Sequence, residues 1–205
     1  PQAVENVAFY YNTDLVKEAP KTWEEVQTLS QQIKDAGTKY GYLIQTTDPY
    51  HFYPVMTSDG GYVFGKNADG SYNAEDLGIN SEGSVAAFDW LNGMYEAKLL
   101  DRNANIDGGL LLSAFQNGDA AMLISGPWAL TGFREAKVPF AVTSIPAGSA
   151  GPGKPFMGVQ GFMINAFSKN QLLAQTFLQE FVATDETMQA FYDLDPRISA
   201  WTAVA

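Results

Sequence analysis

The stretch from Ala120 to Trp128 constrains the fold of this 205-residue chain more than any other. Its first residues form a short apolar run that predicts a buried strand, and Ser125-Gly126 ends it. Pro127 suits the first position of a helix, because the amide hydrogen that proline lacks would be unpaired there. Trp128 is therefore expected in a first helical turn beside the carboxyl end of a strand, the edge at which open α/β sheets bind ligands.

Trp128 has two interpretations. Large aromatic side chains are usually part of a core, and this one could be no more than that. At a strand's carboxyl end, however, an indole offers a flat apolar face with one donor, which suits stacking on a ring. The position favours the second interpretation.

The rest of the chain predicts strands that alternate with helices, which indicates an α/β fold. Thr22 and Glu25 predict a capping box, with Glu25 bonding back to the cap, at the start of a helix that Gly37 ends. A helix after residue 80 is expected to turn Val85, Phe88, Leu91 and Tyr95 inward. Strands are expected at 4–11, 40–44, 138–145 and 156–164, a loop at 46–50, a hairpin at 62–72, and further helices at about 50–58, 110–115, 170–183 and 185–194.

Composition excludes several classes of function. Lys and Arg number 12 against 23 Asp and Glu, a formal net charge of −11, so nucleic acid and anionic membranes are not expected partners. With no cysteine and one histidine, His51, the chain cannot build a disulfide, a thiolate zinc site or a histidine cluster. We therefore expect no metal and no cofactor. Most of the 13 Phe, 10 Tyr and 4 Trp are expected in the core, but an aromatic-rich chain with few charges is also typical of proteins that bind uncharged ligands with apolar faces.

Two apparent motifs fail on inspection. Gly148 to Lys154 has the spacing of a phosphate loop, but Pro155 replaces the required hydroxyl residue and a strand follows. Oxygen-bearing side chains alternate from Asn67 as in a calcium loop, but Tyr72 stands where a glycine is needed. Both segments are predicted to be surface turns.

Two acidic residues are candidates for ligand contact. Asp48-Pro49-Tyr50 is either a simple turn or a loop that fixes a carboxylate beside a ring, the combination that an uncharged polyol requires. Glu5 lies within an apolar strand, so it lies at a solvated strand end, contacts ligand, or has a buried partner.

The chain resembles the maltose/maltodextrin-binding proteins, the extracellular solute receptors of bacterial ABC importers. The matching segments occur in order over nearly the whole chain: Ala3-Val4-Glu5, Tyr11-Asn12-x-Asp14-Leu15, Pro20-Lys21-Thr22-Trp23-Glu24-Glu25, Pro49-Tyr50, Asp59-Gly60-Gly61-Tyr62, Gly126-Pro127-Trp128-Ala129, Lys154-Pro155-Phe156-x-Gly158-Val159, Ile164-Asn165-Ala166 and Thr184-Asp185-Glu186.

This resemblance implies a periplasmic-binding-protein-like (type II) fold, in which two α/β lobes with mixed sheets flanked by helices close over a maltose- or maltodextrin-type saccharide. It implies no catalysis, delivery of the sugar to an ABC permease, and a periplasmic or extracellular location. The residues it assigns to sugar contact are Glu5, Asp48, Tyr50 and Trp128. Asp48 departs from the longer Glu of the family pattern, which puts the choice of sugar in doubt. His51 and Tyr53 replace aromatic residues of the pattern and are expected at the far end of the groove.

The same resemblance divides the chain. Residues 1–6 and 157–164 correspond to crossover strands, 7–156 to the bulk of the second lobe, and 165–205 to a helical segment of the first lobe. Most of the first lobe and the closing segment of the second have no counterpart here, so we expect a fragment. Surfaces that pack on those parts would be exposed apolar patches that favour self-association or a second chain that supplies the missing segments.

Two other classes of function remain open on the sequence alone. A glycoside hydrolase would need two carboxyl groups about 5–10 Å apart, and Glu5 and Asp48 are the available pair. A truncated assembly or scaffold module would need no ligand at all.

Overall fold

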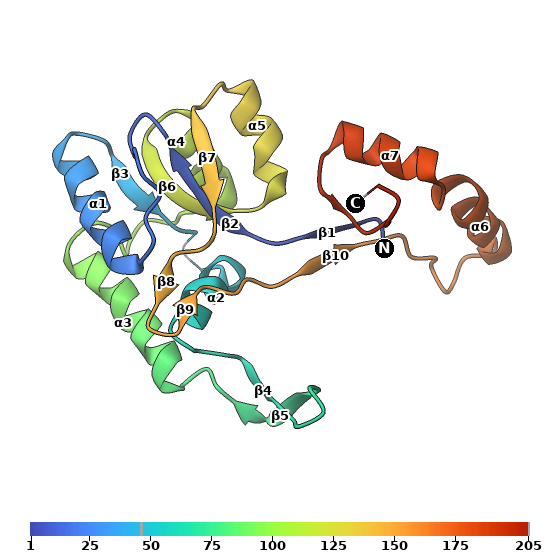
Figure 1. Ribbon diagram of the computed structural model, residues 1–205, viewed down its shortest axis with the longest axis horizontal. Helices are drawn as coiled ribbons and strands as arrows, with labels where there is room; N and C mark the ends of the chain where they lie inside the picture. The colour runs from blue at the N-terminus through green and yellow to red at the C-terminus, as the bar shows by residue number, and fades with distance from the viewer. Residues whose placement is uncertain (46, 205) are drawn as a thin grey trace. The chain divides into compact units, whose positions relative to one another are not determined.

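The computed structural model describes residues 1–45 and 47–204 (Figure 1). Thr46, in the loop predicted before Asp48, and Ala205, at the end of the predicted helical segment, lie outside the described residues. The chain forms two compact units. The larger is Val7–Phe156, and the smaller combines Pro1–Asn6 with Met157–Ala205.

A four-stranded mixed sheet organises the larger unit, in the order β3-β6-β2-β7. β3 and β6 run parallel, whereas β2 is antiparallel to both β6 and β7. Because β3 and β6 are parallel neighbours, their carboxyl ends lie at the same edge of the sheet. The strands are β2 (Ala8–Asn12), β3 (Tyr40–Leu43), β6 (Ala120–Ser125) and β7 (Phe140–Thr143).

Both faces of this sheet are covered. All six residues of β6 are buried, as expected for a central strand with helices on each side. Met122 and Ile124 belong to one core cluster and Leu123 to the other, because successive side chains point to opposite faces. Helices α1 (Trp23–Asp35), α2 (Pro49–Ser58) and α3 (Glu82–Glu96) supply the first cluster, and α4 (Gly108–Gln116) and α5 (Leu130–Glu135) the second.

Helix α1 begins where its cap predicts, with one correction. The Thr22 hydroxyl accepts a hydrogen bond from the Glu25 amide at 3.3 Å. Glu25 does not bond back to the Thr22 amide, however; its carboxylate accepts from the Lys21 amide at 2.6 Å. The helix start is therefore capped from both sides, one residue earlier than a regular capping box.

The inward face predicted for α3 is confirmed only in part: Leu91 and Tyr95 pack against the core of the larger unit, whereas Val85 and Phe88 do not turn inward. Val85 and Phe88 are each 48% exposed, and the buried residues of this helix are Ser84, Ala87 and Met94. Small residues face the protein because the backbones approach closely: a Cβ on Gly83 would lie 2.2 Å from the Asp59 carbonyl oxygen. Farther along the helix, the larger Trp90, Leu91, Met94 and Tyr95 side chains pack against the core.

Two short hairpins complete the larger unit, and both agree with the turns predicted from sequence. β4 (Phe64–Lys66) pairs with β5 (Tyr72–Leu77), and β8 (Ala147–Gly148) pairs with β9 (Gly151–Pro152).

The smaller unit is built around an antiparallel sheet in the order β10-β1-β11. Its strands are β1 (Ala3–Glu5), β10 (Gly158–Gln160) and β11 (Ile198–Ser199). Its helices are α6 (Gln171–Phe177), the π-helical turn η2 (Leu178–Val182) and α7 (Asp185–Leu194), which Thr184 caps as predicted.

Two strand predictions need correction. Residues 4–11 form two strands rather than one, because the chain passes from one sheet to the other between Glu5 and Ala8. Of the extended segment predicted at 156–164, only Gly158–Gln160 pairs as a strand. Among the described residues, no helix combines the length and apolar character that crossing a membrane requires.

Candidate functional site

Two helices begin at the same edge of the larger sheet. β3 ends at Leu43 and α2 begins at Pro49; β6 ends at Ser125 and the 3₁₀ turn η1 (Pro127–Ala129) leads into α5. Each helical segment has proline in its first turn, where the missing amide hydrogen costs nothing. Parallel pairing of β3 with β6 thus brings the Asp48 and Trp128 segments to one edge, as predicted.

Gly126 lets Trp128 fold back over the end of β6. A Cβ at Gly126 would lie 2.2 Å from the indole Cζ3, so no larger residue fits beneath the ring. The Gly126 carbonyl in turn accepts a hydrogen bond from the buried Tyr10 hydroxyl at 2.9 Å. Trp128 remains 37% exposed, so it is half-buried with accessible ring surface rather than a core residue.

Three rings from the two segments meet beside the sheet. The His51 ring lies 6.0 Å from Trp128 and 5.5 Å from Tyr50, edge-to-face in both cases. Tyr50 and Trp128 are 6.4 Å apart between centroids. These distances are typical of contacting aromatic pairs.

Phe156 extends this group, although it was not among the residues predicted to contact ligand. Its ring stacks on Tyr53 at 3.7 Å and lies nearly parallel to Tyr50 at 6.1 Å. Phe156 is 41% exposed, and burial raises the pKa of Tyr53, so its hydroxyl stays a donor. The available signal was Phe156's place in the Lys-Pro-Phe segment of the resemblance. We call Tyr50, His51, Tyr53, Trp128 and Phe156 the aromatic cluster.

Asp48 supplies the carboxylate of the site. One oxygen caps α2 by accepting from the Tyr50 amide at 2.8 Å, and the other pairs with His51 Nδ1 at 2.6 Å. The turn and the ligand interpretations of Asp48 are thus compatible, since the turn places the carboxylate at the cluster. Carboxylate oxygens have several lone pairs, so both can accept further bonds.

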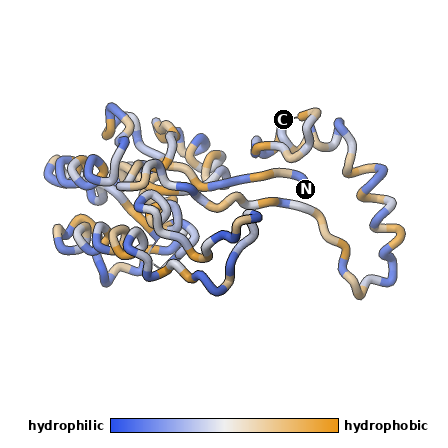
Figure 2. The backbone as a smooth tube through the Cα atoms, turned by 60° about the horizontal axis from the view of Figure 1, so that its bottom comes forward, coloured by the Kyte–Doolittle hydropathy of each residue, from blue (hydrophilic) through white to orange (hydrophobic). Residues whose placement is uncertain are grey.

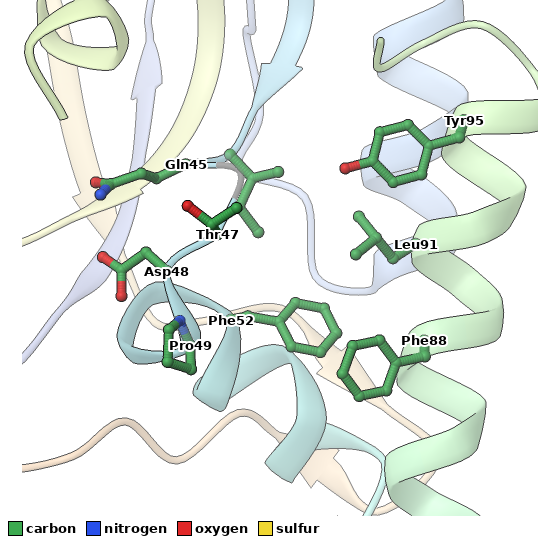
Figure 3. A pocket seen from close by; sticks show the side chains of 9 residues that line it. Gln45, Thr47, Asp48, Pro49, Phe52, Phe88, Leu91 and Tyr95 are labelled. Atoms are coloured by element: carbon green, nitrogen blue, oxygen red, sulfur yellow. The ribbon is translucent and has the colours of Figure 1, made fainter. Parts of the chain in front are cut away.

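The site borders two apolar hollows that share Pro49, Phe52 and Phe88. One, of about 280 Å³, lies between the start of α2 and α3, and Figure 3 shows Phe52 and Phe88 facing each other there. The other, of about 400 Å³, is lined partly by Tyr50, Tyr53 and Phe156. Carbon-rich walls with few polar groups suit an uncharged ligand.

Glu5 belongs to the smaller unit, where it is buried and paired. Its carboxylate accepts from Gln160 Nε2 at 2.7 Å and forms an ion pair with Arg197. The Asp195 hydrogen bond, at 2.6 Å, and then the charges of Asp195 and Glu5 raise the pKa of Arg197. The solvated-end interpretation of Glu5 is therefore wrong, and the buried-partner interpretation is confirmed. Sequence reasoning missed Arg197 and Gln160, which lie far along the chain.

Within the described part of the chain, no group of three or more His, Cys, Asp or Glu residues is arranged to hold a metal ion.

Comparison with known proteins gives consistent matches. The sequence model of the family described as bacterial extracellular solute-binding protein matches residues 1–205. A galactooligosaccharide-binding protein of Bacillus subtilis (strain 168) is 37% identical over 210 residues, covering 100% of this chain and 49% of that protein. The maltodextrin-binding protein MdxE of the same organism is 34% identical, covering 99% and 50%. A maltooligosaccharide ABC transporter solute-binding lipoprotein of Streptococcus pneumoniae (strain ATCC BAA-255 / R6) is 32% identical, covering 98% and 48%. The chain thus spans about half the length of these relatives.

Proposed function

Because this chain belongs to the bacterial extracellular solute-binding protein family, we propose that its larger unit forms one wall of an oligosaccharide site. The observation that carries the proposal is the aromatic cluster, which joins Trp128 to the Asp48 segment at one sheet edge. Ring faces cover the apolar C–H surface of a sugar, and the Asp48 carboxylate accepts bonds from its hydroxyls.

The family is one of transport receptors, not of enzymes, which decides against the glycoside hydrolase alternative. Consistently, Asp48 belongs to the larger unit and Glu5 to the smaller, where Glu5 is already paired. The proposed action is binding and handover without bond cleavage.

The ligand class is proposed more narrowly as a maltose- or maltodextrin-type saccharide. Two relatives named for maltodextrin or maltooligosaccharide support this choice, and one named for galactooligosaccharide provides the competing ligand for a test. An ABC permease is the proposed partner of the complete receptor, outside the cytoplasm.

The two units are proposed to be parts of the two lobes of such a receptor. Residues 7–156 would be the bulk of the second lobe, 1–6 and 157–164 the crossover segments, and 165–205 a helical part of the first lobe. The separation of the chain at residues 6/7 and 156/157 supports this division. The remaining parts would come from another segment or chain.

Titration calorimetry with maltotriose and with a galactooligosaccharide tests the proposal. Trp128→Ala should lower maltotriose affinity about thirtyfold or more, since aromatic anchors of this kind often contribute about 2 kcal/mol or more. Tyr40→Ala is the matched control, because Tyr40 is a partly buried aromatic at the opposite end of β3.

Unchanged affinity in Trp128→Ala would exclude the cluster as the site. Preference for the galactooligosaccharide would keep the site and overturn the narrower ligand class. Reducing-end release from maltodextrin would overturn the receptor assignment.

A further inference from the structure

The Asp48 carboxylate determines which nitrogen of His51 carries the proton. Its Oδ2 lies 2.6 Å from Nδ1, and its Oδ1 accepts from the Tyr50 amide. An ionised carboxylate can only accept, so the proton of this short contact belongs to Nδ1. In the neutral imidazole, Nε2 is then an acceptor.

The His51 ring is held in place while Nε2 stays available. The ring is packed edge-to-face against both Tyr50 and Trp128, and the residue is only 8% exposed. Within residues 1–45 and 47–204, Nε2 has no hydrogen-bond partner. The buried side-chain atoms that lack a partner there are Tyr42 Oη and Ser125 Oγ, so Nε2 is not among them and reaches the surface.

We propose that Asp48 and His51 act together as a selectivity element, in which His51 Nε2 accepts a hydrogen bond from a hydroxyl of a sugar ring stacked on Trp128. This inference rests on the proposed function. Asp48 is the positioning residue, because it fixes the orientation and tautomer of the imidazole. A phenyl ring at position 51 would present only a C–H edge, so the element favours a ligand with a hydroxyl at this place.

Asp48→Asn tests the inference by reversing the tautomer. Only the amide oxygen of asparagine can cap α2, so its NH₂ group must face Nδ1, which then accepts and leaves the proton on Nε2. Asparagine caps helices as well as aspartate does, so the fold is retained. Asp107→Asn is the matched control, since Asp107 caps α4 by accepting from the Leu110 amide at 2.8 Å.

Nitrogen-15 spectra of histidine-labelled protein report the tautomer directly, because the chain has one histidine and therefore one imidazole signal set. In spectra of the neutral imidazole, we expect the proton on Nδ1 in the wild type and on Nε2 in Asp48→Asn. Maltotriose should shift the wild-type Nε2 resonance. A spectrum of the ligand-free wild type that shows the proton on Nε2 would overturn the inference, whatever the binding measurements give.

Calorimetry completes the test. Asp48→Asn should weaken maltotriose binding about threefold, because Nε2 then donates and the sugar hydroxyl must give up the bond that it donated and accept instead. His51→Phe should weaken it about fivefold, because the nitrogen is lost. Asp107→Asn should bind like the wild type. Wild-type binding without an Nε2 shift, or with unchanged affinity in both site variants, would overturn the inference and leave the proposed function standing. No binding by the wild type would overturn both.

Discussion

At the scale of single residues, Tyr10 connects the core of the larger unit to the segment that carries Trp128. Its ring is 2% exposed and packs edge-to-face on Phe133 at 5.7 Å. Its hydroxyl donates to the carbonyl of Gly126, the residue whose missing Cβ leaves room for the indole. Burial raises the pKa of Tyr10 to about 12, although the charge of Arg134 acts in the opposite direction.

This raised pKa predicts a loss of stability in alkali. The neutral phenol is favoured in the folded state, so its contribution is complete below about pH 10, the usual tyrosine pKa, and is lost as pH rises toward 12. Between about pH 8 and pH 11 the free energy of unfolding of the wild type should fall about 1 kcal/mol further than that of Tyr10→Phe.

Urea unfolding followed by circular dichroism at both pH values measures this difference. At about pH 8, Tyr10→Phe should be the less stable protein by about 1 kcal/mol, because the bond to Gly126 is lost. Equal alkaline losses in the two proteins would show that Tyr10 does not titrate in a buried environment.

At the scale of elements, helix α1 shows how local chemistry determines a boundary. The Thr22 hydroxyl and the Glu25 carboxylate each satisfy a backbone amide at the helix start. On the inner face, Trp23, Val26 and Ile33 are buried in the core of the larger unit. The cap therefore fixes the start of a helix that contributes directly to that core.

We expect Thr22→Ala to lower the free energy of unfolding by about 1 kcal/mol, because the Glu25 amide loses its acceptor. Thr22→Ser retains the hydroxyl and should stay close to the wild type. Urea midpoints of the three proteins provide the measurement, and equal midpoints for alanine and serine would contradict the capping role.

Elements with local signals were predictable from sequence, and those that depend on distant partners were not. Caps and apolar runs predicted α1, α7 and β6, because these signals lie within a few residues. The prediction of one strand at 4–11 was wrong. Apolar character does not reveal that the two halves of this segment pair in two different sheets. The α3 face was predicted only in part: Leu91 and Tyr95 pack inward, whereas Val85 and Phe88 are exposed near the close backbone approach at Gly83.

The candidate site shows the same limit. Asp48, Tyr50 and Trp128 could be assigned to one site from sequence, because each follows the end of a predicted strand. His51 was expected at the far end of the groove, whereas its ring lies beside both Tyr50 and Trp128. Phe156 approaches Tyr53 from a segment more than 100 residues away. No periodic pattern signals such a contact.

At the scale of the whole molecule, the two units differ in how much apolar surface they bury. The large apolar residues Val182 and Met188 are buried in the smaller unit, while many others there are exposed. Exposed apolar residues occur along 157–167 and on α6 and η2, where Phe177 and Phe181 stack at 5.8 Å; Figure 2 shows the apolar stretch that follows β10. Contiguous apolar surface of this kind usually contacts another polypeptide.

We therefore expect self-association when no other chain covers this surface. Light scattering should give a mass that rises above the 22.3 kDa monomer with concentration. Replacing both Phe177 and Phe181 by serine should shift the rise to higher concentration. Tyr72→Ser, which removes a 72% exposed aromatic from the hairpin of the larger unit, is the control and should change nothing. A wild-type monomer at every concentration would contradict the expectation.

The pairing of β1 with β10 also has a consequence for the order of folding. This ladder joins Ala3–Glu5 to Gly158–Gln160, so forming it from an unfolded chain would close a loop of about 150 residues, at an entropic cost of about 4 kcal/mol. The intervening residues form a continuous unit whose β2 strand lies beside the neighbouring β6 and β7. Once that unit has folded, the connection between β1 and β10 is no longer a flexible loop. The entropic cost of pairing these two strands is then smaller. The ladder between β1 and β10 is thus expected to form last.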